Sequence, residues 1–357
     1  MLISYRLANL RNFLDQKNVN AIIIKKSANL KYFSGFTGDS TFLIVTHKKN
    51  ILITDGRYIE QAKSESTKFE IIEQKEGLIK KLCEVLNEIG ILSVGFEENV
   101  VTVSEFNKIK ENLPKIKLTP LTIDELRQVK DETEIEKIQK ACEIADKSFD
   151  EILKFIKPGM REIEVAAELE YFMRKFGAQK PAFDTIVASG MRGILPHGIA
   201  TEKIIKVGEF VTMDFGAIYQ NYNSDMTRTI FIGRADEKQR KIYNSVLSAQ
   251  YSGLKNIKEG ISGKEADKSV RDLLEKDGFE KFFSHGLGHG VGLEIHEEPR
   301  LSKLSTCEKL LENMIVTDEP GVYIPNFGGI RIEDTVLVTK NFAKSLTKSP
   351  KHLIEII

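Results

Sequence analysis

The most informative stretch of this 357-residue chain is HGLGHGVGLEIHE at residues 285–297, which holds three of its six histidines and four of its glycines. The glycine spacing does not fit the dinucleotide-binding pattern G-x-G-x-x-G, because position 291 is Val and position 293 is Leu. No strand–loop–helix frame surrounds the stretch, and no nucleophile elbow supports a serine triad built on Ser284. We therefore interpret the glycines as places where the backbone passes close to a crowded site.

Acidic residues in apolar surroundings form the second part of the pattern. Asp214 ends the run FVTM, Asp225 begins the run MTRTIFI, Glu319 follows another mostly apolar run, and Glu333 interrupts the alternating segment 330–338. A buried carboxylate is costly unless it is paired or binds a metal. Any one of these acids, taken alone, is better explained as an exposed or helix-capping carboxylate. The four acids together with His289 indicate a metal site.

Charge balance points to two divalent ions, because four carboxylates carry −4 and two such ions carry +4. Oxygen ligands with one imidazole favour Mn²⁺ or Co²⁺, with Zn²⁺ as a further candidate, and none of the three cysteines falls in these motifs. Two such ions can lower the pKa of a shared water and polarise a carbonyl. The sequence thus indicates hydrolytic chemistry.

Helix signals dominate the segment before this site. Asp131 and Glu134 form a capping box, and one apolar face follows at helical spacing: Ile135, Ile138, Cys142, Ala145, Phe149, Ile152 and Phe155. A second helix is expected over residues 162–176, with Gly177 as its stop. Residues 156–177 also align with residues 257–278 at an offset of 101, which reflects either shared helix-cap chemistry or a duplicated half-domain.

The N-terminal third alternates strand-like and helical segments, as in an α/β domain. We expect strands at Ala21–Ile24, Thr41–Thr46, Ile51–Thr54 and Ser93–Phe96, and a helix at Leu78–Leu86. The pattern breaks at residues 114–124, where we find no clear periodicity. We therefore expect one domain over residues 1–120 and a second over residues 121–357.

Composition excludes several partners. Lys plus Arg and Asp plus Glu both number 52, so the zero net charge argues against nucleic acid or an anionic membrane as partner. The apolar runs are too short to span a bilayer, and Arg6, Arg11 and Asp15 interrupt any signal peptide. Three scattered cysteines exclude a disulfide framework and favour the cytoplasm.

Taken together, these motifs resemble the pita-bread metallopeptidases, in the branch of Xaa-Pro dipeptidases (prolidases) and Xaa-Pro aminopeptidases. The segments FTG at 36–38 and TDGRY at 54–58 are similar to a creatinase-type N-terminal domain, and FDTIVASG at 183–190, PHG at 196–198 and the ligand set are similar to the catalytic domain. The resemblance implies an α/β fold with a creatinase-type domain followed by a duplicated α+β pita-bread domain.

The resemblance also implies a role for each site residue. The metal ligands would be Asp214, Asp225, His289, Glu319 and Glu333, with Asp225 and Glu333 bridging both ions. The catalytic set would be His197, His285, His296, Glu319 as proton acceptor, and Arg331, with Tyr323 as a wall of the pocket. Asp318, an unusual acid beside Glu319, is expected to point to the opposite face of its strand.

We therefore expect a cytoplasmic, homodimeric enzyme that hydrolyses the peptide bond before proline in dipeptides or short peptides, with two divalent ions. A methionine aminopeptidase is an alternative, which the N-terminal domain disfavours. A non-catalytic pita-bread binding protein and a creatinase-like hydrolase are further alternatives, disfavoured because no metal ligand is missing. Sequence does not separate dipeptidase from aminopeptidase.

Overall fold

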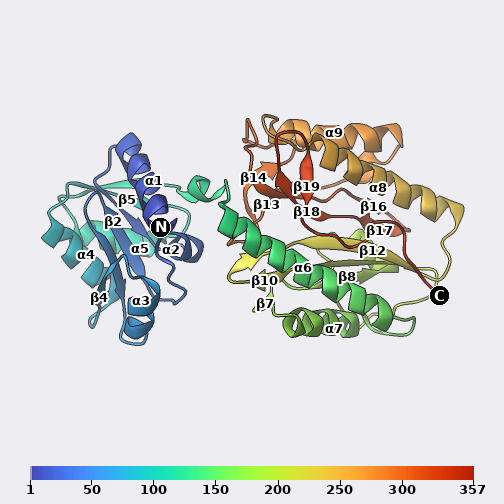
Figure 1. Cartoon of the computed structure of the whole chain (residues 1–357), viewed down its shortest axis with the longest axis horizontal. Helices are drawn as coiled ribbons and strands as arrows, with labels where there is room; N and C mark the ends of the chain where they lie inside the picture. The colour runs from blue at the N-terminus through green and yellow to red at the C-terminus, as the bar shows by residue number, and fades with distance from the viewer. Residues whose placement is uncertain (1) are drawn as a thin grey trace. The chain divides into compact units, whose positions relative to one another are not determined.

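The computed structural model describes residues 2–357, which form two compact units. The first unit ends at Arg127 and the second begins at Gln128 (Figure 1). No helix within the described residues is both long enough and apolar enough to cross a membrane.

A six-stranded mixed sheet forms the centre of the N-terminal unit, in the order β4-β3-β2-β1-β5-β6. The strands are β1 (Ala21–Ile24), β2 (Phe42–Thr46), β3 (Asn50–Thr54), β4 (Glu70–Glu73), β5 (Ser93–Glu97) and β6 (Lys117–Leu121). The helices are α1 (Leu2–Lys17), α2 (Ser27–Ser34), α3 (Ile59–Glu65), α4 (Leu78–Ile89) and α5 (Val103–Asn112). The four predicted strands and the predicted helix are confirmed to within three residues at each end.

Both faces of this sheet are buried. Ile23 and Ile44 join Leu86 of α4 and Ile109 of α5 in one apolar cluster. Alternate strand residues such as Ile22 point to the other face and are equally buried. Continuous apolar runs, rather than an alternating pattern, are what a sheet covered on both sides requires.

Residues 114–124, where the sequence shows no clear periodicity, contain a regular strand, because β6 lies there and pairs in parallel with β5. Pro120 hides the strand in the sequence, since proline has no amide hydrogen for a ladder bond and is tolerated mainly at sheet edges. β6 is an edge strand, which explains its presence. The boundary expected between residues 120 and 121 lies inside β6, whereas the compact units divide after Arg127.

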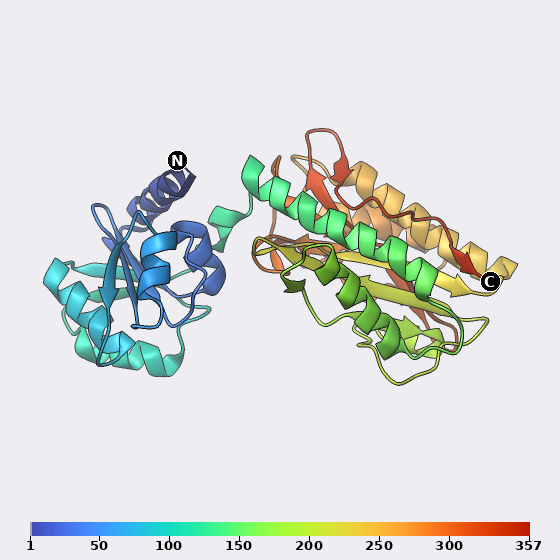
Figure 2. The same cartoon turned by 60° about the horizontal axis from the view of Figure 1, so that its bottom comes forward.

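Two helix pairs lie against the strands of the C-terminal unit: α6 (Glu132–Phe155) with α7 (Glu162–Lys175), and α8 (Glu237–Asn256) with α9 (Gly263–Lys276) (Figures 1 and 2). The capping box of Asp131 and Glu134 is confirmed. The buried face of α6 ends at Ile152, however, because Phe155 is the last helical residue and is 37% exposed.

The strands of this unit form four sheets. The first half contributes β7 (Lys180–Pro181), β8 (Ile186–Ser189), β9 (Phe210–Phe215), β10 (Ala217–Tyr219), β11 (Tyr222–Asn223) and β12 (Met226–Ile232). The second half contributes β13 (Gly288–Gly290), β14 (Glu297–Leu301), β15 (Ile315–Asp318), β16 (Gly321–Ile324), β17 (Gly328–Arg331), β18 (Asp334–Val338), β19 (Ala343–Ser345) and β20 (Glu355–Ile356).

The two halves repeat one arrangement, in which a helix pair packs on an antiparallel set of strands. In the first half, Phe149 and Leu169 pack with Val211 of β9 and Ile230 of β12. In the second half, α8 and α9 pack with β15 and β18 through a separate apolar cluster. The aligned segments 156–177 and 257–278 each begin directly after one helix, α6 or α8, and contain the whole of the next, α7 or α9. Duplication of the half-domain, rather than shared cap chemistry alone, accounts for this.

Candidate metal centre

Strand ends bring the predicted ligands together. Asp214 lies near the end of β9, opposite Thr227 of the antiparallel β12, and Asp225 directly precedes β12. His289 is the middle residue of β13, and Glu319 directly follows β15. All of these strands converge on one cavity.

Glu333 departs from the expectation that it interrupts a single strand. It lies between β17 and β18, where the chain passes from one sheet to another. Its amide donates to the carbonyl oxygen of Thr227 at 3.1 Å, which fixes the crossing. The carboxylate therefore projects from a junction between two sheets.

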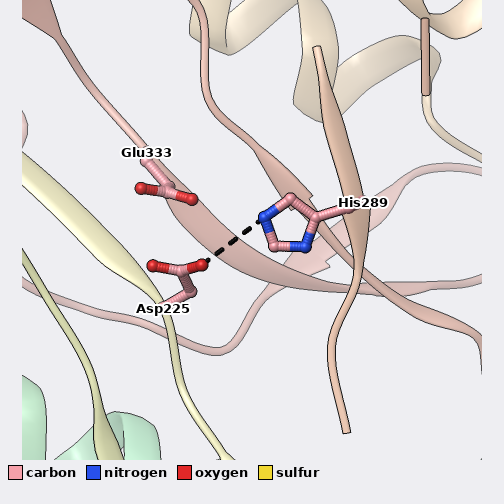
Figure 3. Close-up of side chains that lie close together, drawn as sticks. All are labelled: Asp225, His289 and Glu333. Atoms are coloured by element: carbon pink, nitrogen blue, oxygen red, sulfur yellow. Dashed lines mark ion pairs between the residues drawn. The ribbon is translucent and has the colours of Figure 1, made fainter. Parts of the chain in front are cut away.

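Asp225, His289 and Glu333 form the tightest group. One ligand atom from each lies within 4.8 Å of the others, and all three side chains are buried (Figure 3). His289 Nε2 lies 3.6 Å from Asp225 Oδ2 and 3.6 Å from Glu319 Oε1. These separations suit oxygen and nitrogen atoms that share a cation.

The tautomer of His289 leaves a nitrogen for metal. Its Nδ1 lies 3.0 Å from the carbonyl oxygen of Gly290, which accepts hydrogen bonds only, so Nδ1 carries the proton. Burial lowers the pKa of His289 to about 3, so the ring is neutral at pH 7. The unprotonated Nε2 faces the acids, as a metal-ligating histidine requires.

Asp214 is held from one side only. Its Oδ2 accepts from Arg331 Nη2 at 2.6 Å, whereas its Oδ1 is buried and has no hydrogen-bond partner. Arg331 also donates to Tyr323 Oη at 2.7 Å and to Thr227 Oγ1 at 3.0 Å. The orphaned oxygen of Asp214 is a donor atom without a protein partner, which is what a ligand position offers.

Burial and mutual repulsion disfavour the ionised acids in the protein alone. Burial, with repulsion from Glu333 and Asp214, raises the pKa of Asp225 well above its usual value. Burial, with repulsion from Glu319 and Asp214, does the same for Glu333. Burial raises the pKa of Glu319 to about 8. Divalent cations would remove this penalty, so the donor set fits them.

Three threonines form hydrogen bonds with the predicted ligands and hold them in place. Thr227 Oγ1 donates to Glu333 Oε2 at 2.6 Å. Thr317 Oγ1 donates to Glu319 Oε1 at 3.2 Å and accepts from the amide of His289 at 3.1 Å. In the same way, Thr335 Oγ1 accepts from the amide of Asp225 and donates to its carbonyl oxygen, at 3.1 and 2.7 Å. The sequence analysis missed all three, because a threonine in a strand carries no distinctive signal.

Glycines allow the strands to approach. A Cβ atom at Gly288 would lie 2.1 Å from the carbonyl oxygen of Thr317, and one at Gly290 would lie 2.4 Å from that of Glu298. Neither position accepts a side chain. The expectation that these glycines let the backbone pass close to a crowded site is confirmed.

The cavity has a volume of about 570 Å³. It is lined by the nine residues predicted to bind metal or to act in catalysis: His197, Asp214, Asp225, His285, His289, His296, Glu319, Arg331 and Glu333. Tyr323, which was predicted as a wall of the pocket, does not line the cavity itself and contacts His285, which does. It is also lined by residues to which the sequence analysis gave no role: Phe183, Asp184, Ile186, Pro196, Ile199, Ile295 and Arg300. Arg300 lies in β14, four residues after His296. This closeness in the sequence was the one signal that could have pointed to Arg300 as a site residue.

Two further histidines differ in how they are held. His285 Nδ1 contacts the carbonyl oxygen of Gly286 at 2.8 Å, and its Nε2 contacts Tyr323 Oη at 2.8 Å. Burial lowers the pKa of His285 to about 4, so it is neutral at pH 7. The exposed ring of His296 makes an edge contact with His289, with centroids 4.2 Å apart.

Asp318 points away from this cavity, as alternation along the strand predicts. Its carboxylate lies against the backbone of α8, where a Cβ atom at Gly253 would meet Asp318 Oδ1 at 2.0 Å. It contributes nothing to the metal centre directly.

Comparisons with known proteins agree with this geometry. Residues 136–340 match the model of metallopeptidase family M24, and residues 6–129 match the creatinase/prolidase N-terminal domain. The chain belongs to metallopeptidase family M24. This family implies divalent metal binding, and the predicted family and two-part fold are confirmed.

Relatives within family M24 are similar over nearly their whole lengths. The solved Xaa-Pro dipeptidase from Bacillus anthracis is 42% identical, with a TM-score of 0.96 over 99% of this chain and 100% of that one. The solved X-Pro aminopeptidase from Thermotoga maritima is 39% identical, with a TM-score of 0.91 over 98% and 100%. A Xaa-Pro dipeptidase of Pyrococcus furiosus is 44% identical over 98% of this chain and 99% of its own.

Proposed function

We propose that this M24 enzyme is a dinuclear metallopeptidase that hydrolyses the peptide bond before proline, with dipeptides as its main substrates. The observation that carries the proposal is the convergence of four carboxylates and one unprotonated imidazole nitrogen on one cavity. Relatives named as Xaa-Pro dipeptidases and X-Pro aminopeptidases support the bond class.

Five residues would hold the two ions, with Mn²⁺ or Co²⁺ preferred for these oxygen-rich ligands and Zn²⁺ as a further candidate. Asp225 and Glu333 would bridge both ions, Asp214 would complete one shell, and His289 with Glu319 the other. The orphaned Asp214 Oδ1 and the 3.6 Å contacts of His289 support this division. When bound, the metals supply an activated water and a polarised carbonyl.

Other residues of the cavity would move the proton, stabilise the carbonyl oxygen and position the substrate. Glu319 is the proposed proton acceptor for the attacking water, because it lies at the edge of the ligand group and lines the cavity. His296 and His197 line the same cavity and are placed to donate to the carbonyl oxygen as negative charge develops. His285, fixed by Tyr323, would form a wall for the proline ring, and Arg331 would hold Asp214 and Tyr323 in place.

Arg300 favours a dipeptidase over an aminopeptidase. Arg300 lines the cavity, and the free carboxylate of a dipeptide is the anion that a guanidinium fork binds with two parallel hydrogen bonds. A longer peptide carries an amide at that position and offers Arg300 no charge. The contrast predicts that Arg300→Gln weakens hydrolysis of Ala-Pro much more than that of Ala-Pro-Ala.

The test is hydrolysis of Ala-Pro, Ala-Pro-Ala and Ala-Ala by protein that has been stripped of metal and reloaded with Mn²⁺, Co²⁺ or Zn²⁺. We expect preference for Ala-Pro, no activity in the stripped protein, and two equivalents of metal in the active form. Equal cleavage of Ala-Ala would replace the proline assignment with a broad aminopeptidase. Preference for Ala-Pro-Ala would make the enzyme an Xaa-Pro aminopeptidase.

We further propose that the enzyme works as a homodimer in the cytoplasm. All three cysteines are free thiols, and two of them, Cys83 and Cys142, are buried, as suits a reducing compartment. The dimer is the expectation for this family, and analytical ultracentrifugation of the full chain tests it. A monomer at the concentrations used for assay would refute it.

A further inference from the structure

The segment Phe283–Leu287 carries His285 into the cavity and is held by two side chains of α9. Arg271 donates to the carbonyl oxygen of Phe283 at 2.9 Å and also to that of His285. Asp267 Oδ1 accepts from the amide of Leu287 at 3.0 Å. The backbone is thus fixed by hydrogen bonds on both sides of the histidine.

The two side chains form one unit. Arg271 Nε lies 2.7 Å from Asp267 Oδ2, and Nη2 lies 3.2 Å from Oδ1, so the pair is bidentate across one helical turn. The side chains are only 10% and 1% exposed. The guanidinium also lies 4.2 Å from the centre of the Phe283 ring. Two buried, mutually bonded charges leave each other little freedom to move.

The segment itself offers little rigidity. His285 is followed by Gly286 and, after Leu287, by Gly288, and glycine restricts the backbone least of all residues. An outside constraint is therefore needed to keep the ring of His285 beside Tyr323 and within 3.9 Å of Glu319 Oε2. The α9 pair supplies three of the hydrogen bonds that hold the segment, and the amide of Glu319, which donates to the carbonyl oxygen of Leu287 at 2.9 Å, supplies another.

We propose that Arg271 and Asp267 are positioning residues that set the place of the His285 ring in the substrate cavity. They lie outside that cavity, in a surface groove of about 420 Å³ along α9, and act on it through the backbone of the segment 283–287. The inference rests on the proposed function, because it assigns the purpose of the pair to the role of His285 there.

We call the buried pair of Arg271 and Asp267 the clamp. The test removes the clamp without leaving a buried charge unpaired. The double variant Arg271→Gln/Asp267→Asn neutralises both partners together, which avoids the penalty for leaving one of them alone. Lys268→Gln is the matched control, because Lys268 lines the same groove but its ion pair is with the half-exposed Asp272 and lies away from the segment 283–287. If the double variant does not fold, Arg271→Lys keeps the charge and loses the bidentate fork.

In the double variant we expect kcat/KM on Ala-Pro to fall by roughly 10- to 100-fold, the scale of a misplacement of about 1 Å near the reacting atoms. Metal content should stay at the wild-type value. Hydrogen–deuterium exchange of the segment 283–289 should become faster than in Lys268→Gln. Unchanged exchange and unchanged kcat/KM would overturn the inference.

A double-mutant cycle with His285→Ala separates positioning from general structural support. If the α9 pair acts through His285, removing the clamp in the His285→Ala background should add almost no loss of kcat/KM. Full additivity would overturn the inference and leave the proposed function intact. Failure of the wild-type enzyme to cleave Ala-Pro would instead refute the proposed function. The hydrogen–deuterium exchange of the segment 283–289 would still test whether the clamp holds this segment in place.

Discussion

Replacement of Glu333 by Gln should change stability in opposite directions with and without metal. The metal centre gathers four carboxylates against one fully buried cation, Arg331, so the group carries −4 + 1 = −3 when all the acids are ionised. Glu333 is 1% exposed, and burial with repulsion from Glu319 raises its pKa well above the usual value. Above the usual pKa of glutamate, folding without metal must therefore either protonate Glu333 or bury its repelled charge, and glutamine keeps the shape while avoiding both costs.

The expected change in the free energy of unfolding follows from the burial of Glu333. Relief of one buried, repelled charge is worth about 1–3 kcal/mol in the metal-free protein. For a domain the size of the C-terminal unit, about 2 kcal/mol corresponds to a rise in Tm of roughly 4–8 °C. With metal present, the wild type gains about 2.7 kcal/mol for each ion at an ion concentration 100-fold above Kd, or about 5.4 kcal/mol for the two proposed ions, and the variant loses most of this gain.

The assay is thermal unfolding of wild type and Glu333→Gln, first with a chelator and then with excess Mn²⁺, together with metal content and turnover of Ala-Pro. The variant should melt above the wild type in chelator and below it in Mn²⁺, and turnover should fall by roughly 10²-fold or more. Glu308→Gln, at an exposed position of the same unit, should change neither curve. A variant that melts at or below the wild type in chelator would refute the reasoning about charge.

Three further changes test other parts of the structure. Thr227→Val removes the 2.6 Å hydrogen bond to Glu333 and should weaken metal binding by roughly 10- to 100-fold in competition titrations, with Thr227→Ser restoring it. Phe149→Ala empties a fully buried site and should lower the free energy of unfolding in urea by about 3–5 kcal/mol. Asp318 is buried, and neither of its carboxylate oxygens has a hydrogen-bond partner. Asp318→Asn should therefore stabilise the protein by roughly 1 kcal/mol, which raises Tm by a few degrees. A fall in Tm would show that the carboxylate has a stabilising partner.

Local rules were sufficient for the elements with the strongest patterns. The capping box at Asp131 and the apolar spacing that follows defined α6, because helix ends and helix faces depend on residues three or four positions apart. Continuous apolar runs located β1, β2 and β3. They could not locate β6, because Pro120 is acceptable only at an edge, and edge position is a property of the whole sheet.

The nine predicted site residues could be proposed from the sequence because their chemistry is conspicuous in apolar surroundings, and because the motifs resemble a known family. All nine line one cavity. Arg300, Thr227 and the pair of Arg271 and Asp267 were not identifiable in this way. Residues of these types are common in strands and helices, and their role follows only from the partner that each one contacts in the folded protein.

The sequence by itself therefore determined the elements with strong local patterns and the types of candidate ligand, since these depend on neighbours along the chain. The offset of 101 residues left duplication and shared helix-cap chemistry both open, and the packing of the two halves decided between them. Only the tertiary structure decided which oxygen of Asp214 is unpaired, which nitrogen of His289 faces the acids, and which side chains hold the segment around His285. These depend on contacts between residues up to 117 positions apart, as in the bond from Arg331 to Asp214. No periodicity or spacing encodes such contacts, because they arise only when separate strands pack together.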